Sequence, residues 1–197
     1  MDALKAGKDV YCEKPFTYTY EQARECYEEA EKRNKIVQVG VNSCSDSRWG
    51  DAFKLIEDGK IGKILMTTGH HSRNSKEGEW NYAIDKAADP NKNLDWNAFL
   101  GSAPKTSWEP ERYFRWRKFW DYSGGIATDL FFHQLTHLLL ALDGTEYPEF
   151  PRRVSAFGGI YQFWDREVPD TFTMQIDYPA NHTVVLIASM AHDVGIQ

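Results

Sequence analysis

This 197-residue sequence has few cysteines, no long apolar run and no excess of basic residues. The three cysteines, Cys12, Cys26 and Cys44, are widely spaced and odd in number, which excludes a disulfide framework and a CxxC metal pair. No apolar run reaches the ~18 residues of a membrane span. The net charge is −6 with acidic and basic residues interspersed, which argues against a nucleic-acid-binding protein. We therefore expect no membrane and no nucleic-acid partner.

Several signatures are also absent. The sequence contains no GxGxxG, no GxxxxGK[ST] and no GxSxG, so it lacks a dinucleotide fingerprint, a P-loop and a nucleophile elbow. No positively charged start followed by an apolar stretch is present, which argues against a secretory signal in this chain. With the cysteines interpreted as small buried hydrophobes, we expect a reducing, cytoplasmic location.

What remains is the composition of a globular protein, with 42% hydrophobic and 26% charged residues. Residues 9–12 and 36–41 have the pattern of buried strands, and each is followed by a segment with helical periodicity. Thr19 and Gln22 have capping-box spacing at the start of the first helix. Alternating strands and helices predict a parallel α/β sheet over residues 1–60.

The character of the chain changes near residue 60. A strand is expected over 64–72, an irregular segment over 73–123 and one helix over about 126–142. Strands then follow at 153–163, 171–178 and 183–190, the last two as a hairpin. The prediction is α/β followed by α+β, in two domains of residues 1–60 and 61–197.

Glu13-Lys14-Pro15 directly follows the first strand. Ligands of parallel sheets bind beyond the carboxyl ends of strands, so Lys14 is either a charge placed at a ligand or a solvated loop lysine. Pro15 restricts Lys14 to extended geometry, which would aim the side chain consistently. Spacing alone does not decide between the two interpretations.

Asp129 and His133 have i, i+4 spacing on the expected apolar helix, so they share one face. An acid beside an imidazole can fix its tautomer and raise its basicity, but such a pair can also be purely structural. His133 and His137 have the spacing of helical zinc ligands, a weaker alternative. His70 and His71 point to opposite faces of their strand, so we expect one packed and one solvated.

The segment 73–123 carries five tryptophans, including Trp116, among Arg112, Arg115 and Arg117. Aromatic rings most often form core, and we expect this of most of the five. Rings beside guanidinium groups also suit a polyhydroxylated ligand, because sugar faces stack on rings while the cations bind hydroxyls. Arg115, Trp116 and Arg117 are therefore candidate substrate-binding residues.

Together these segments resemble the Gfo/Idh/MocA family of nicotinamide-dependent oxidoreductases. "AGKDVYCEKPFTYTYEQARECYEEAEKRNKIVQVGVN" is similar to the family's segment around its EKP motif. "DAFKLIEDGKIGKI" is similar to the crossover into the second domain, and "GGIATDLFFHQLTHLLLAL" to the helix with the family's aspartate and histidine. The resemblance runs in order through essentially the whole chain.

The resemblance implies a partial Rossmann domain followed by a domain with an open, mainly antiparallel sheet. It implies catalytic roles for Lys14, Asp129 and His133, and places Glu13, Lys14, Pro15 and Asn42 against an NAD or NADP cofactor. The family often has a cis peptide before the EKP proline. Gln134 and Thr136 stand where the family often has aspartate, which puts the substrate contacts in doubt.

The implied activity is hydride transfer between NAD(P) and a secondary alcohol of a sugar, inositol or sugar derivative. His133 would act as general base, Lys14 would polarise the reacting oxygen, and no metal is expected. The alternatives are an NAD-dependent glycoside hydrolase of the same family and a catalytically silent or oligomerisation chain. We expect a homo-oligomer through the second-domain sheet, and a glycine-rich loop and a final part of that sheet outside these residues.

Overall fold

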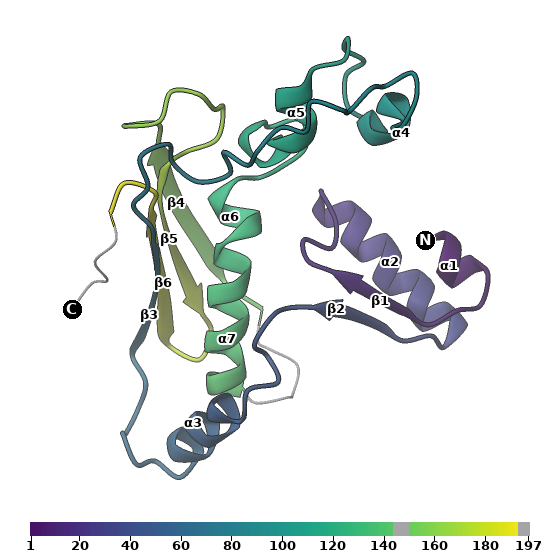
Figure 1. Cartoon of the computed structure of the whole chain (residues 1–197). Coiled ribbons are helices and arrows are strands. Elements are labelled where there is room, and N and C mark those ends of the chain that lie inside the picture. The colour runs from purple at the N-terminus through teal and green to yellow at the C-terminus, as the bar shows by residue number, and fades with distance from the viewer. Residues whose placement is uncertain (144–149, 193–197) are drawn as a thin grey trace. The chain divides into compact units, whose positions relative to one another are not determined.

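The computed structural model describes residues 1–143 and 150–192 (Figure 1). Residues 144–149, which begin with the Gly144 that follows the predicted helix, and residues 193–197 lie outside the described residues. The described residues form two compact units: 1–61 with 136–143, and 62–135 with 150–192. None of the helices in these described ranges is long and apolar enough to cross a membrane.

The first unit alternates helices and strands, beginning with a short helix. Its elements are α1 (Asp2–Lys5), β1 (Val10–Glu13), α2 (Tyr20–Arg33), β2 (Val37–Gly40) and α3 (Ser47–Glu57). Strands β1 and β2 pair in parallel, with Val10 opposite Val37 and Glu13 opposite Gly40. The parallel pairing predicted for this part of the chain is therefore confirmed.

Helix α2 begins at the predicted capping box. The Thr19 side chain accepts a hydrogen bond from the Gln22 backbone N–H, and the Gln22 side chain accepts one from the Thr19 N–H. These reciprocal bonds satisfy two of the donors that a helix start leaves unpaired. Cys26 and Ala30 are buried on the inner face of the helix, as the periodicity predicts.

The second unit contains a four-stranded sheet. Its elements are β3 (Met66–Ser72), α4 (Trp96–Leu100), α5 (Pro110–Phe114), the 3-10 helix η1 (Trp116–Lys118), α6 (Ile126–Asp129), the start of α7 (Phe131–Asp143), β4 (Arg153–Gly159), β5 (Thr171–Tyr178) and β6 (His182–Ser189). The strand order is β3-β6-β5-β4. Strand β3 runs parallel to β6, and the other two pairs are antiparallel, so the predicted open, mainly antiparallel sheet is confirmed.

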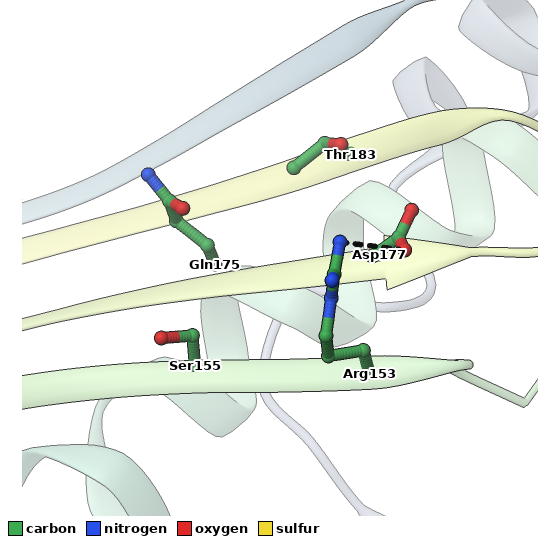
Figure 2. A pocket seen from close by; sticks show the side chains of 5 residues that line it. All are labelled: Arg153, Ser155, Gln175, Asp177 and Thr183. Carbon is green, nitrogen blue, oxygen red and sulfur yellow. Dashed lines mark hydrogen bonds and ion pairs between the residues drawn. The ribbon is translucent and has the colours of Figure 1, made fainter.

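The two faces of this sheet differ. One face buries Ile176, Val184 and Leu186 almost completely and forms the core of the unit. Phe131, at the start of α7, packs on Phe172 of this face, with ring centroids 5.7 Å apart. The other face carries a polar pocket lined by Arg153, Ser155, Gln175, Asp177 and Thr183 (Figure 2).

The segment 73–123, predicted to be irregular, folds as short helices around aromatic side chains. Trp96 packs against Phe99 and edge-on against Trp108, and its indole N–H donates to the Thr106 carbonyl. Trp80 and Trp96 are buried, whereas Trp120 is 48% exposed. Two of the five tryptophans are thus buried in the core and two, Trp108 and Trp116, are half-buried, so the expectation that most form core is met only in part.

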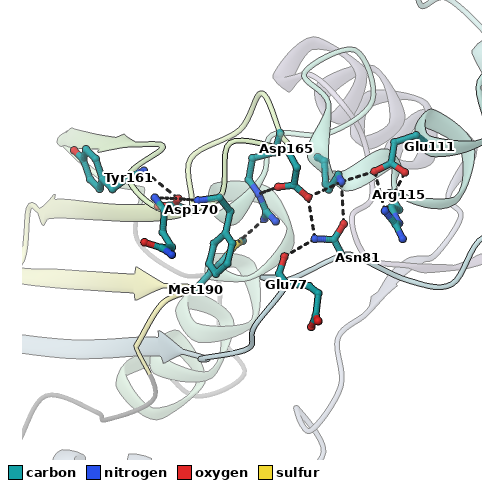
Figure 3. Close-up of polar contacts among 12 residues, drawn as sticks. Glu77, Asn81, Glu111, Arg115, Tyr161, Asp165, Asp170 and Met190 are labelled. Carbon is teal, nitrogen blue, oxygen red and sulfur yellow. Dashed lines mark hydrogen bonds and ion pairs between the residues drawn. The ribbon is translucent and has the colours of Figure 1, made fainter.

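A buried lysine ties this segment to the loop that follows β4. The Lys118 side chain is fully buried, and its ammonium contacts Glu111, Asp165 and Asn81 (Figure 3). The Asn81 amide also donates to Asp165, at 2.9 Å. Since a buried ammonium is stable only when paired, these contacts fix three separated parts of the chain together.

The carboxylate of Asp170 organises the same loop. Asp170 is fully buried and accepts hydrogen bonds from the backbone N–H groups of Tyr161, Gln162 and Phe163, at 3.0, 2.8 and 2.8 Å (Figure 3). These three donors supply the hydrogen bonds that a buried polar group needs. The loop is therefore held by its own backbone donors.

The single helix predicted over about 126–142 is wrong in one respect, since the structure has two helices separated at Leu130. The φ angle of Leu130 is −104°, well away from the usual helical value of about −63°. Asp129 ends α6 and His133 lies in the first turn of α7, and Leu130 between them remains in the right-handed helical region.

Candidate active site

The candidate residues lie in both units. Lys14 belongs to the first unit and directly follows β1. Its backbone N–H donates to the carbonyl of Gly40, the last residue of β2, at 3.1 Å. The Lys14-Pro15 peptide bond is cis, as the resemblance implies. Lys14 is thereby held at the carboxyl edge of a parallel strand pair, where ligands of such sheets bind.

Asn42 follows β2 at the same edge and is exposed. Its carbonyl lies 2.9 Å from Nε2 of His137, a residue of the part of α7 that belongs to the first unit. The His137 ring also stacks on Trp49, with centroids 4.8 Å apart. His137 is thus engaged with the loop that follows β2, which does not support the zinc-ligand alternative. Within residues 1–143 and 150–192, no group of three or more His, Cys, Asp and Glu side chains is arranged to hold a metal ion.

In the second unit, Asp129 is positioned by the two glycines that precede α6. Gly125 has a φ of +60°, and a Cβ at this position would stand 2.8 Å from the Cβ of Val168. Only glycine satisfies both restrictions. The Gly125 N–H donates to the Ser123 hydroxyl, and the Gly124 N–H donates to the Thr128 hydroxyl. The start of α6 is therefore fixed, and with it the position of Asp129.

Asp129 is buried, with 4% of the residue exposed. Its side chain is paired with Arg117, whose Nε donates to Oδ1 at 3.1 Å. The Arg117 guanidinium also lies 4.3 Å from the ring centroid of Trp116. Two of the three predicted substrate residues are thereby brought to Asp129. Arg115 is placed differently, since it donates to the Glu111 carboxylate and to the Tyr82 carbonyl.

His71 is a further candidate active-site residue, which was not assigned to a site from the sequence. It lies on β3, and Ala188 stands opposite it on β6. Its Nε2 is buried and has no hydrogen-bond partner among the described residues. Burial, aided by the nearby charges of Arg73 and His133, lowers the pKa of His71 to about 4. The pairing of the strands was needed to reveal this neighbourhood, because sequence alternation shows only that His70 and His71 face opposite ways.

The residues at the carboxyl edge of β1 and β2 fit one end of a nicotinamide dinucleotide. An ammonium from Lys14 and an amide from Asn42 can donate to carbonyl and hydroxyl oxygens. The pyrophosphate of such a cofactor is usually held at a glycine-rich turn, and no GxGxxG occurs in the 197 residues. The chain therefore offers donors for the nicotinamide end and no glycine-rich fingerprint for the phosphates.

Comparison with known proteins also indicates an NAD-binding oxidoreductase. Residues 1–41 match the family model "Oxidoreductase family, NAD-binding Rossmann fold", and residues 51–156 match "Oxidoreductase family, C-terminal alpha/beta domain". An uncharacterized oxidoreductase of Schizosaccharomyces pombe is 42% identical over 81 residues, which are 40% of this chain and 22% of that protein. An inositol 2-dehydrogenase of Gluconacetobacter diazotrophicus is 38% identical over 88 residues, covering 44% and 26%.

A solved structure has the same fold. The crystal structure of an NAD-binding protein from Listeria innocua matches with a TM-score of 0.64 at 22% identity, covering 99% of this chain and 45% of that one. The chain thus spans less than half the length of that protein, and its aligned segments cover about a quarter of the curated relatives. With both family models matched in order over most of its residues, the chain belongs to the Gfo/Idh/MocA family of NAD-binding oxidoreductases.

Proposed function

We propose that this chain carries the substrate-side machinery of a dehydrogenase that oxidises a secondary alcohol of a sugar, inositol or sugar derivative. The observation that carries the proposal is the placement of the family's two motifs. Lys14 stands at the carboxyl edge of the parallel strands, and Asp129, four residues before His133, is buried beside Arg117. The inositol 2-dehydrogenase relative supports a polyol as the substrate class.

In the proposed reaction, the substrate hydroxyl gives its proton to the imidazole of His133 as the carbonyl forms. The Lys14 ammonium donates a hydrogen bond to the same oxygen and stabilises the negative charge that develops there. A bound NAD or NADP would supply the hydride acceptor for the carbon that carries the hydroxyl. The protein therefore contributes a base, an electrostatic donor and the orientation of the substrate.

Asp129 is proposed to orient the substrate or His133. Its ion pair with Arg117 compensates its charge, because a buried carboxylate without a partner is costly. Trp116 and Arg117 are proposed to contact the polyol, the ring through an apolar sugar face and the guanidinium through hydroxyls. For Arg115, the contacts with Glu111 and Tyr82 support a structural role besides the proposed substrate contact.

Substitution of Lys14 by methionine tests the electrostatic role. The experiment uses the full natural polypeptide that contains this chain, with polyol oxidation followed by NADH or NADPH formation. Loss of one oxyanion donor is expected to lower kcat by at least about tenfold, with a smaller effect on substrate KM. Lys8, an exposed lysine that precedes β1, provides the matched control, and Lys8→Met should behave like the unmodified protein. Equal rates for both variants would remove Lys14 from the mechanism.

We also propose that two copies of the protein associate through the second-unit sheet, on the face that carries the polar pocket. Phe157 and Met66 are 74% and 61% exposed on this face, and half-buried Val185 and Ile187 lie between them in the sheet order. Exposed apolar side chains grouped on a sheet are typical of an interaction surface. Light scattering at micromolar concentration should give a mass above that of the monomer, reduced by Phe157→Asp but not by Trp164→Asp, a control outside the sheet. A monomeric mass for the unmodified protein would contradict the proposal.

A further inference from the structure

Two consecutive backbone carbonyls in the loop after β2 accept hydrogen bonds from two aromatic side chains. The Asn42 carbonyl is 2.9 Å from Nε2 of His137, and the Ser43 carbonyl accepts the indole N–H of Trp49 at 2.9 Å. A carbonyl cannot donate, so the His137 ring must carry its proton on Nε2 in this contact. The two donors therefore constrain adjacent peptide groups.

The two donor rings also support each other. The His137 and Trp49 rings are nearly parallel, at an interplanar angle of 12° and a centroid separation of 4.8 Å. Trp49 lies in the first turn of α3, whose N-cap is Asp46. The stacked rings thus join the first-unit part of α7, the start of α3 and the loop. We call His137 and Trp49 the ring clamp.

The ring clamp acts on a backbone that needs such support. Ser43 has a φ of +67°, a left-handed conformation that is unfavourable for a residue other than glycine. The turn also has two backbone hydrogen bonds, from the Cys44 N–H to the Val41 carbonyl at 3.5 Å and from the Asp46 N–H to the Ser43 carbonyl at 3.2 Å. The ring clamp adds two side-chain donors to these backbone bonds, and His137 is the one that bonds to the Asn42 carbonyl.

The constrained loop lies beside Lys14 in the sheet, because the Lys14 N–H bonds to Gly40, two residues before Asn42. We propose that His137 is a positioning residue, which holds Asn42 in place for the nicotinamide end of the dinucleotide through the ring clamp. This inference rests on the proposed function for the identity of the ligand. The contacts between the ring clamp and the loop do not involve that ligand.

Two readouts test the proposal on separate grounds. The first is alkylation of Cys44 in the unliganded 197-residue chain, with Cys12 in the same sample as internal reference. Cys44 lies in the loop and is half-buried, and burial raises the pKa of its thiol. Loss of one hydrogen bond opens a local segment more often, so His137→Phe should raise the Cys44 to Cys12 ratio by about fivefold.

The second readout is the KM for NAD or NADP of the full natural polypeptide, with its dissociation constant from titration. His137→Phe keeps a stacking ring and removes the N–H, and we expect KM to rise about fivefold while kcat changes less than about twofold. His137→Gln retains an N–H donor on a side chain of similar reach and should restore both readouts. His182→Phe is the control, since His182 stacks on Tyr178 at the same 4.8 Å but its Nε2 has no partner among the described residues.

The outcomes separate the inference from the proposed function. A rise in Cys44 alkylation together with a rise in KM supports the positioning role. Increased alkylation with unchanged KM and dissociation constant overturns it, because the loop is then loosened without consequence for the ligand. Unchanged alkylation also overturns it. A natural polypeptide that binds no dinucleotide contradicts the proposed function, and the positioning role with it, whatever Cys44 does.

Discussion

Replacing His133 by asparagine is expected to lower kcat for polyol oxidation by about 10²–10⁴-fold, the range typical of a lost general base. Asparagine keeps a polar side chain that can hydrogen-bond to the substrate, but it cannot accept the hydroxyl proton at neutral pH. The substrate KM should change far less than kcat. Initial rates of NADH or NADPH formation by the full natural polypeptide measure both parameters.

His70 provides the control for this substitution. It is an exposed histidine on β3, next in sequence to His71, whose Nε2 is buried. His70→Asn changes the same chemical groups and should leave kcat within about twofold, as surface substitutions usually do. If His133→Asn retains the rate of the unmodified protein, another group takes the proton and the assignment of His133 is wrong.

Replacing Lys118 by methionine is expected to destabilise the chain by about 3 kcal/mol, the lower end of the range for breaking a buried ion pair. The Lys118 side chain is fully buried, and its removal leaves Glu111 and Asp165 without their shared ammonium. Their partial exposure keeps the effect at that lower end. Denaturant unfolding followed by circular dichroism measures the change. Lys105→Met, which removes an exposed ammonium from the Gly101 carbonyl, should cost less than about 0.5 kcal/mol.

The pH dependence of this effect follows from the two carboxyl groups. Burial alone would raise the pKa of Asp165, but the Lys118 ammonium and the Asn81 amide outweigh it and lower the pKa from 3.8 to about 2. Burial of Glu111 is likewise outweighed by Lys118 and Arg115, so its pKa lies below 4.5. A lowered folded-state pKa stabilises the protein above the unfolded value, and this contribution is lost as the pH falls through the folded value. The difference between unmodified protein and Lys118→Met should therefore be largest above about pH 4.5 and shrink toward pH 2. A difference that does not depend on pH would show that Lys118 acts through packing alone.

The features predicted correctly from the sequence are those with local signals. Thr19 and Gln22 form the capping box because both partners lie within one helical turn. Lys14 and Pro15 follow β1, whose last residue is Glu13, close to where the apolar run ends, and their position beside β2 follows from the parallel pairing of the two strands. Gly125 marks the start of α6 because its conformation excludes other residues.

Features that depend on distant contacts were not predicted. Lys118 is fully buried although its sequence neighbourhood is that of a polar loop, and its partner Asp165 lies 47 residues away. His137 has the spacing of a metal ligand with His133, yet it bonds to Asn42, 95 residues earlier. The break at Leu130 lies inside an apolar run with continuous helical periodicity. In each case tertiary packing overrides a local pattern. The contacting residue is distant in the sequence, so it cannot be identified from a single sequence.

Hydride transfer from a labelled substrate tests the central claim most directly. The full natural polypeptide that contains this chain is incubated with NAD or NADP and a polyol that carries deuterium on its oxidisable carbon. The proposed function predicts that the deuterium appears in the reduced nicotinamide and that a ketone forms in equal amount, both measured by mass spectrometry. A sugar product released without net reduced dinucleotide, or a reduced dinucleotide without deuterium, would contradict it.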